Sequence, residues 1–259
     1  MNVESSRARN ISSGVISKVA QVTLMFWVIK ILATTLGETG GDALSMTLNL
    51  GYGLSSLIFL GFFAVTLAAQ IVSRRYHPAI YWAVVVATTT VGTTTSDYLD
   101  RTLELGYVKS SIMLFSMVIA ILIAWHFTTG EIAVDRITTR KNEIFYWVTI
   151  LVSNTLGTAL GDFTASTTGL GFERGALVFA GLIAIVAAAH YFTKLPDSVL
   201  FWAAYVLTRP LGATLGDIVT KPRADGGLNL GRIGSSLTIA VVMIALIAVT
   251  SRRKRIEAD

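Results

Sequence analysis

The chain of 259 residues has no cysteine, only four prolines and few charged residues, which make up 14% of its composition. The absence of thiols excludes disulfide bonds and thiolate-bound metals. Motifs of the HExxH and GxSxG types are also missing in any context that would support them. We therefore expect neither an enzyme nor a bound cofactor.

Hydrophobic residues, in contrast, make up 53% of the chain. They form continuous runs of about 18 to 22 residues, the length that crosses the hydrocarbon core of a bilayer as a helix. The runs do not alternate between apolar and polar residues, which disfavours strands. Eight spans are predicted, at about 18–37, 52–73, 79–96, 110–129, 143–161, 174–193, 197–216 and 233–251.

One pattern occurs four times: an aromatic pair ending in Trp, then a Gly ten residues after the Trp, then an Asp five residues after the Gly. The four copies are Phe26/Trp27/Gly37/Asp42, Tyr81/Trp82/Gly92/Asp97, Tyr146/Trp147/Gly157/Asp162 and Phe201/Trp202/Gly212/Asp217. A fixed period indicates one structural unit used repeatedly. We predict a single membrane domain over residues 1–259, with helical-hairpin repeats at about 18–74, 75–130, 140–194 and 195–253.

The two helices of each repeat differ in composition. The second helix is almost uniformly apolar, which suits contact with lipid. The first carries a polar stripe 7, 11 and 15 residues after its Trp, positions that share one helix face. The stripe reads Thr34/Glu38/Asp42, Thr89/Thr93/Asp97, Asn154/Thr158/Asp162 and Arg209/Ala213/Asp217, and Lys30 extends it in the first repeat.

Small residues accompany the stripe as pairs four positions apart, which allow helix backbones to approach closely. These are Gly37 and Gly41, Gly92 and Ser96, Gly157 and Gly161, and Gly212 and Gly216. The sequence therefore predicts an all-α polytopic membrane protein in which the first helices, the odd-numbered spans, are inner and the second, even-numbered helices are outer.

The basic residues predict the orientation. Thirteen lie on the side of the termini, against six on the other side. By the positive-inside rule, both termini are then cytoplasmic in the cell inner membrane. The thirteen are Arg7, Arg9, Lys18, Arg74, Arg75, Arg136, Arg140, Lys141, Lys194, Arg252, Arg253, Lys254 and Arg255; the six are Arg101, Lys109, Arg174, Lys221, Arg223 and Arg232.

Two interpretations of the repeated features stay open. Each Asp either caps a broken helix end or takes part in cation coordination or proton relay. The aromatic pairs form interfacial or packing anchors, or else a substrate cage. The residues found in only one repeat, Lys30, Glu38, Asn154 and Arg209, favour function more strongly, although a structural Lys30–Glu38 or Arg209–carboxylate pair is the alternative. Pro210 is expected to kink its helix at the level of Arg209.

The chain resembles a bacterial family of uncharacterised membrane proteins defined by a repeat of unknown function. The resemblance rests on Trp27, Trp82, Trp147 and Trp202, with the Gly and Asp that follow each, and covers about residues 18–253. It implies the eight-helix architecture of four tandem hairpins and supplies no activity and no site residues.

From the stripe we predict a transporter of an inorganic cation. A divalent metal is the candidate substrate, and coupling to a proton is the candidate mechanism. The candidate pathway residues are Lys30, Thr34, Glu38, Asp42, Thr89, Asp97, Asn154, Asp162, Arg209 and Asp217. Of these, Glu38, Asp42, Asp97, Asp162 and Asp217 are candidate metal ligands, because hard cations prefer oxygen.

Two alternatives remain: a carrier of a small organic or anionic solute, and a non-transporting scaffold. The expected partners are the lipid bilayer and the transported ion or solute, and a second copy of the chain in a homo-oligomer is a further candidate partner. No nucleic acid is expected, because the basic tail Arg252 to Arg255 is better explained by contact with anionic lipid.

Overall fold

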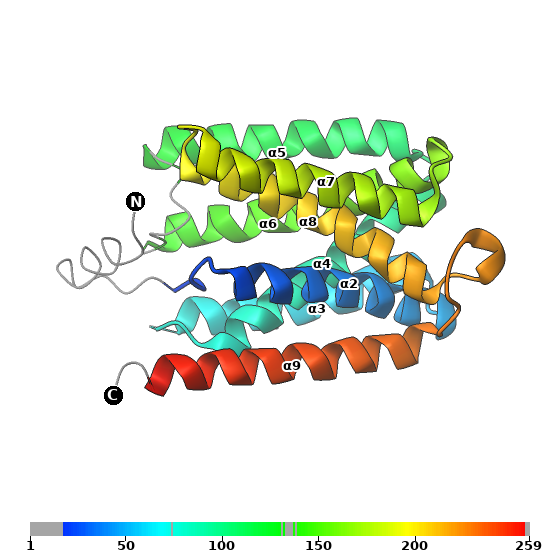
Figure 1. The fold of residues 1–259 in the computed structure, drawn as a ribbon, viewed down its shortest axis with the longest axis horizontal. Coiled ribbons are helices and arrows are strands. Elements are labelled where there is room, and N and C mark those ends of the chain that lie inside the picture. Colours follow the sequence, from blue (N-terminus) through cyan, green and yellow to red (C-terminus); the bar gives the residue numbers. More distant parts are fainter. Residues whose placement is uncertain (1–17, 74, 131, 133–136, 138, 257–259) are drawn as a thin grey trace.

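The computed structural model describes residues 18–73, 75–130, 132, 137 and 139–256. In this part of the chain there are eight long helices and no strand, which confirms the all-helical prediction. The helices run roughly side by side, and the described chain begins and ends at the same end of the bundle (Figure 1). They are α2 (Leu24–Asp42), α3 (Gly51–Val72), α4 (Pro78–Asp97), α5 (Tyr107–Thr129), α6 (Arg140–Asp162), α7 (Gly171–Phe192), α8 (Asp197–Thr220) and α9 (Arg232–Ile256).

The helix boundaries differ most from the prediction in α2 and α8, the first helices of repeats one and four, and at the end of α9. α2 begins at Leu24 rather than near residue 18, because the Thr23 hydroxyl caps it by accepting a hydrogen bond from the Phe26 amide at 3.2 Å. The hydrophobic runs underestimate where α2 and α8 end, since their polar last turns find partners inside the bundle.

A broken helix end at each Asp, which one of the two interpretations requires, is not present in the described helices. Beyond Asp42, Asp97 and Asp162 the helix continues into a five-residue π-helical turn, and these three side chains make no capping hydrogen bond. The turns are η1 (Ala43–Thr47), η2 (Tyr98–Thr102) and η3 (Phe163–Thr167). α8 runs past Pro210 without interruption and is followed by the short 3-10 helix η4 (Arg223–Asp225).

Five of the described helices are long and apolar enough to cross a membrane: α3, α5, α6, α7 and α9. The remaining three, α2, α4 and α8, carry polar stripes that lower their hydropathy. Four of the five apolar helices are mostly exposed, with at most 22% of their most apolar stretch buried inside the protein, whereas the value for α6 is 72%. Their exposed apolar surfaces suit a lipid environment.

The first helices of the four repeats form a closed inner ring. α2 packs against α4 and α8, and α6 packs against the same two helices. The inner placement of first helices and the outer placement of second helices therefore agree with the sequence analysis.

The outer helices pack with an offset of one repeat. α3 lies against α4, α5 against α6 and α7 against α8, so each second helix covers the first helix of the following repeat. α9 completes the cycle by packing on α2, which brings the last repeat onto the first. The four repeats are thus interlocked, and no hairpin packs as a separate unit.

The ring helices approach closely because each contact contains a glycine. A Cβ on Gly37 would lie 2.3 Å from the Thr89 hydroxyl oxygen, and one on Gly212 would lie 2.0 Å from that of Thr34. Gly92 faces Asn154 and Gly157 faces Arg209 in the same way. Each glycine therefore meets the stripe residue of the next repeat, and no larger side chain fits.

Several residues used to predict orientation lie outside the described residues. These are Arg7, Arg9, Arg74 and Arg136, and, for their side chains, Arg253, Lys254 and Arg255 with the lipid contact expected of them. The positions of both chain termini are likewise outside the described part.

Candidate polar pathway along the inner ring

The polar stripe occupies the middle and one end of the inner ring, and aromatic side chains occupy the other end. We call the eight residues of the Phe/Tyr–Trp pairs the aromatic layer. The four Asp, with Arg101, Lys221 and Arg232, form the ionic layer. Between the two layers lie Lys30 and the pair formed by Arg209 and Glu38.

The aromatic layer is a cycle of ring contacts. The first aromatic residue of each pair touches the Trp of the next repeat: Phe26 on Trp82, Tyr81 on Trp147, Tyr146 on Trp202 and Phe201 on Trp27, with centroids 5.6 to 6.0 Å apart. Trp82, Trp147 and Trp202 are buried. The pairs therefore pack on one another, which favours the packing interpretation over the substrate cage.

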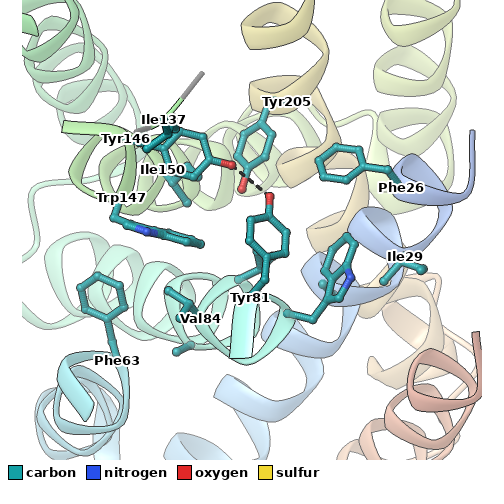
Figure 2. Packing of buried hydrophobic residues seen from close by; sticks show 14 of the residues in the cluster. Phe26, Ile29, Phe63, Tyr81, Val84, Ile137, Tyr146, Trp147, Ile150 and Tyr205 are labelled. Atoms are coloured by element: carbon teal, nitrogen blue, oxygen red, sulfur yellow. Dashed lines mark hydrogen bonds between the residues drawn. The ribbon is translucent and has the colours of Figure 1, made fainter. Parts of the chain in front are cut away.

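Three tyrosines close the centre of this end. The Tyr81 and Tyr146 hydroxyls are hydrogen-bonded at 3.0 Å. The Tyr205 ring lies beside them with its hydroxyl directed toward that pair (Figure 2). The Tyr205 hydroxyl is buried and has no hydrogen-bond partner.

Lys30 lies one level further along the ring and is fully buried. Its ammonium is 4.1 Å from the centroid of the Tyr205 ring and 3.5 Å from the side-chain oxygen of Asn154. Asn154 in turn donates to the Thr88 hydroxyl at 3.0 Å. None of the ion pairs among the described residues joins Lys30 to Glu38, so that structural alternative is not observed.

Arg209 crosses the ring and contacts all three other inner helices. Its guanidinium is 3.1 Å from Glu38 Oε2 and donates to the hydroxyls of Thr93 and Thr158. The arginine is fully buried and Glu38 is 4% exposed. The Arg209–carboxylate alternative left open by the sequence is therefore the one that forms, and the pair lies in the centre of the ring.

A small residue in repeat four makes room for this guanidinium. At the level of Glu38, Thr93 and Thr158 the fourth repeat has Ala213, and Arg209 reaches these residues from one turn below. The arginine head thus fills the space that a larger residue at position 213 would take. The Arg209 Nε atom is buried without a hydrogen-bond partner.

Thr34 and Thr89 have a packing role at the helix contacts. The Thr34 hydroxyl lies 3.2 Å from the Thr208 carbonyl of α8, and that of Thr89 lies 3.1 Å from the Ala33 carbonyl of α2. Both also bond to carbonyls of their own helix. These two predicted pathway residues therefore support the ring.

In the ionic layer, bases from two repeats bridge aspartates of neighbouring repeats. Arg101 contacts Asp97 at 2.9 Å and Asp162 at 3.3 Å. Lys221 contacts Asp217 at 3.2 Å and Asp42 at 3.4 Å.

Arg232 adds a second contact to Asp42 at 3.2 Å. Burial lowers the pKa of Lys221, but Asp217 and Asp42 more than offset this effect, and the pKa is raised.

The sequence contains a signal for these bridges that the motif spacing alone did not reveal. Arg101 and Lys221 each stand four residues after the Asp of their own repeat, whereas Met46 and Ser166 hold this position in repeats one and three. The base is present in repeats two and four and absent from repeats one and three. The ion pairs of the ionic layer therefore repeat twice around a ring of four helices.

These bases change the charge balance expected from the stripe. Five acids against Lys30 and Arg209 would leave an excess of three negative charges. Arg101, Lys221 and Arg232 supply the missing three positive charges, so the buried acids of the stripe are matched in number. In the described part of the chain, no three Asp, Glu or His side chains gather as a metal-binding group. Metal ligation by Glu38 and the four Asp stays a prediction.

The four repeats also appear in a comparison with known families. The model described as "Repeat of Unknown Function (DUF347)" matches residues 25–76, 80–131, 145–195 and 200–255, one match for each helical hairpin. No curated protein and no solved structure matches the chain. The expected resemblance is thus confirmed for the four tandem repeats, and the chain belongs to the family defined by this repeat of unknown function.

Proposed function

We propose that this protein is an inner-membrane transporter of an inorganic cation, with eight spans and both termini in the cytoplasm. The exposed apolar faces of α3, α5, α7 and α9 and the bias of basic residues support this orientation. In it, the aromatic layer closes the ring toward the cytoplasm and the ionic layer faces outward.

The observation that carries the proposal is the buried Arg209–Glu38 pair in the centre of the ring. Ionisable residues inside a membrane protein are costly and typically mark ion pathways. Arg209 stays charged at all relevant pH values. In the proposal, the Glu38 carboxylate can release the Arg209 guanidinium and bind a cation or a proton in its place. The 3.1 Å pair then corresponds to the state in which the arginine serves as counter-ion.

In the proposed cycle, the aspartates of the ionic layer attract the cation from outside. Arg101 and Lys221 hold these carboxylates until the cation displaces them. At the next level the cation competes with Arg209 for Glu38, which carries or exchanges a proton, and Arg209 or Lys30 restores neutrality when the site empties. Oxygen donors of this kind suit a divalent metal.

The test is cation flux through the purified protein in liposomes, over a panel of mono- and divalent cations with and without a proton gradient. Glu38→Gln is expected to stay folded and to lose flux or its pH dependence, and Arg209→Gln to impair flux. Glu143→Gln is the matched control. Glu143 is as buried as Glu38, but it lies outside the stripe and its Oε2 atom is 3.0 Å from the Lys18 ammonium. Wild-type flux by Glu38→Gln would reject the mechanism.

A scaffold without transport is the second candidate, favoured by the close glycine contacts and the paired charges of the ring. The two candidates differ in water access. A cysteine at Thr158 or Ala213 in this otherwise cysteine-free chain should react with a small water-soluble thiol reagent in a transporter. Complete protection at both positions in the folded protein would support the scaffold. Transport of an anion ranks lower, because Arg209 is already engaged by Glu38.

The orientation can be tested separately with single cysteines at exposed positions. Lys194 lies between α7 and α8, at the aromatic end, and Asp225 lies in η4, at the ionic end. An impermeant thiol reagent added to intact cells should label a cysteine at position 225 and leave one at position 194 unmodified. The reverse labelling pattern would invert the proposed topology.

A further inference from the structure

Asp100 is a buried carboxylate that the ionic layer does not use. It lies in η2, three residues beyond Asp97, and is 8% exposed. The Ser96 hydroxyl donates to its Oδ2 atom at 3.2 Å. Its Oδ1 atom is buried and has no hydrogen-bond partner.

Among the described residues, no basic residue forms an ion pair with this carboxylate. Arg101, its neighbour in the chain, is directed to Asp97 and Asp162. None of the ion pairs found in the described ranges includes Asp100. A buried carboxylate without a counter-charge is costly, so the group requires either a proton or a bound cation.

The surroundings of Asp100 supply further oxygen atoms. Ser110 lies in the first turn of α5, which packs against η2. Its hydroxyl donates to the Gly106 carbonyl at 3.2 Å and to the Tyr107 carbonyl at 3.3 Å, and it also interacts with the Asp100 carboxyl. The pKa of Asp100 is raised, because burial outweighs the opposing effects of Ser110, Ser96 and Arg101.

The other repeats have no acid at this position. The equivalents of Asp100 are Ser45, Ala165 and Thr220. The serine pair at the start of the following helix recurs as Ser55 and Ser56 in repeat one and as Ser235 and Ser236 in repeat four, whereas Gly175 and Ala176 replace it in repeat three. The hairpin therefore forms without this carboxylate, and the acid is found in repeat two alone among the four repeats.

We propose that Asp100, with the hydroxyls of Ser96 and Ser110, binds a monovalent cation, and that sodium is its ligand. One negative charge matches a monovalent ion, and carboxylate and hydroxyl oxygens are donors for hard cations. The site lies beside the ring and does not depend on the transport proposed above.

The test is thermal unfolding of the purified full-length chain in detergent, with choline chloride replaced stepwise by sodium chloride at constant ionic strength. A ligand that binds only the folded state raises Tm in a saturable way. The wild-type protein should show this rise. Asp100→Asn should show no difference between the two salts, and Asp225→Asn, an exposed control, should respond as the wild type does.

Ser110→Ala provides a second variant should Asp100→Asn fail to fold. Loss of one hydroxyl ligand should move the half-saturating sodium concentration upward several-fold, which the loss of a purely structural serine would not do. Equal Tm values in choline and sodium for the wild type would show a protonated Asp100 and overturn the proposal. A sodium response retained by Asp100→Asn, or an unchanged half-saturation in Ser110→Ala, would overturn it as well.

Discussion

At one end of the inner ring, eight aromatic side chains meet in contacts that repeat around all four helices, whereas at the other end four aspartates are held by bases from only some of the repeats. The aromatic contacts are nearly equivalent, because a hydrophobic contact has no sign and each repeat can supply both partners. At the ionic end, the base four residues after the Asp is present in repeats two and four and absent from repeats one and three, so the bridges do not repeat around the ring. The comparison teaches that the packing contacts follow the four-fold repeat, whereas the ion pairs do not.

The frame shared by both ends should be the most sensitive to change. Gly212→Leu places a side chain where even a Cβ would be 2.0 Å from the Thr34 hydroxyl oxygen. Overpacking alone typically costs about 1–3 kcal/mol. Because the Thr34 backbone is also in the way here, the loss should exceed the roughly 3–5 kcal/mol of a broken buried ion pair. We expect little folded protein, measured as the monodisperse fraction after extraction. Gly181→Leu is the control, since nothing lies within 4 Å of its Cβ position; equal yields would contradict a close-packed ring.

Between the two ends, Arg209→Gln should have the next largest effect. It leaves Glu38 buried without its base, and breaking a buried pair from one side costs about 3–5 kcal/mol. The double variant Arg209→Gln/Glu38→Gln should regain part of this loss, because no buried charge then remains unpaired. The measurement is the denaturation midpoint of the three proteins in detergent. A double variant less stable than Arg209→Gln would show that the pair is not the source of the cost.

At the aromatic end, Trp147→Ala should destabilise the protein by about 3 kcal/mol, because it leaves a cavity under two tyrosine rings. Trp147 is 1% exposed and its ring centroid is 5.7 Å from that of Tyr81 and 5.0 Å from that of Tyr146. Trp147→Phe should lose less, and Phe127→Ala, at an 84% exposed position, should lose little. The loss should not change with salt, which Tm values at low and high ionic strength would check.

At the ionic end, Lys221→Gln should have the smallest effect, about 1–2 kcal/mol. Its contacts to Asp217 and Asp42 are partly accessible to solvent, so salt screens them. The Tm difference between wild type and Lys221→Gln should therefore shrink as ionic strength rises, in contrast to the Trp147 variants. A difference independent of salt would mean that Lys221 acts through packing and would remove the contrast between the two ends.

The sequence predicted the repeated part of the structure well. The Trp–Gly–Asp spacing predicted four units, and helical spacing placed the polar stripe and the small residues on the face that forms the ring. The hydrophobic runs located all eight helices. They placed the ends of α2 and α8 too early, because polar residues continue a helix once tertiary partners satisfy them.

The sequence alone determined the helices, their repetition and their inner or outer position, because composition and period act locally along the chain. Only the tertiary structure decided that each outer helix covers the next repeat, that Arg209 pairs with Glu38, and that Arg101 and Lys221 bridge neighbouring repeats. Those choices depend on distances across the ring between residues far apart in the chain, and a spacing pattern within one helix carries no information about them.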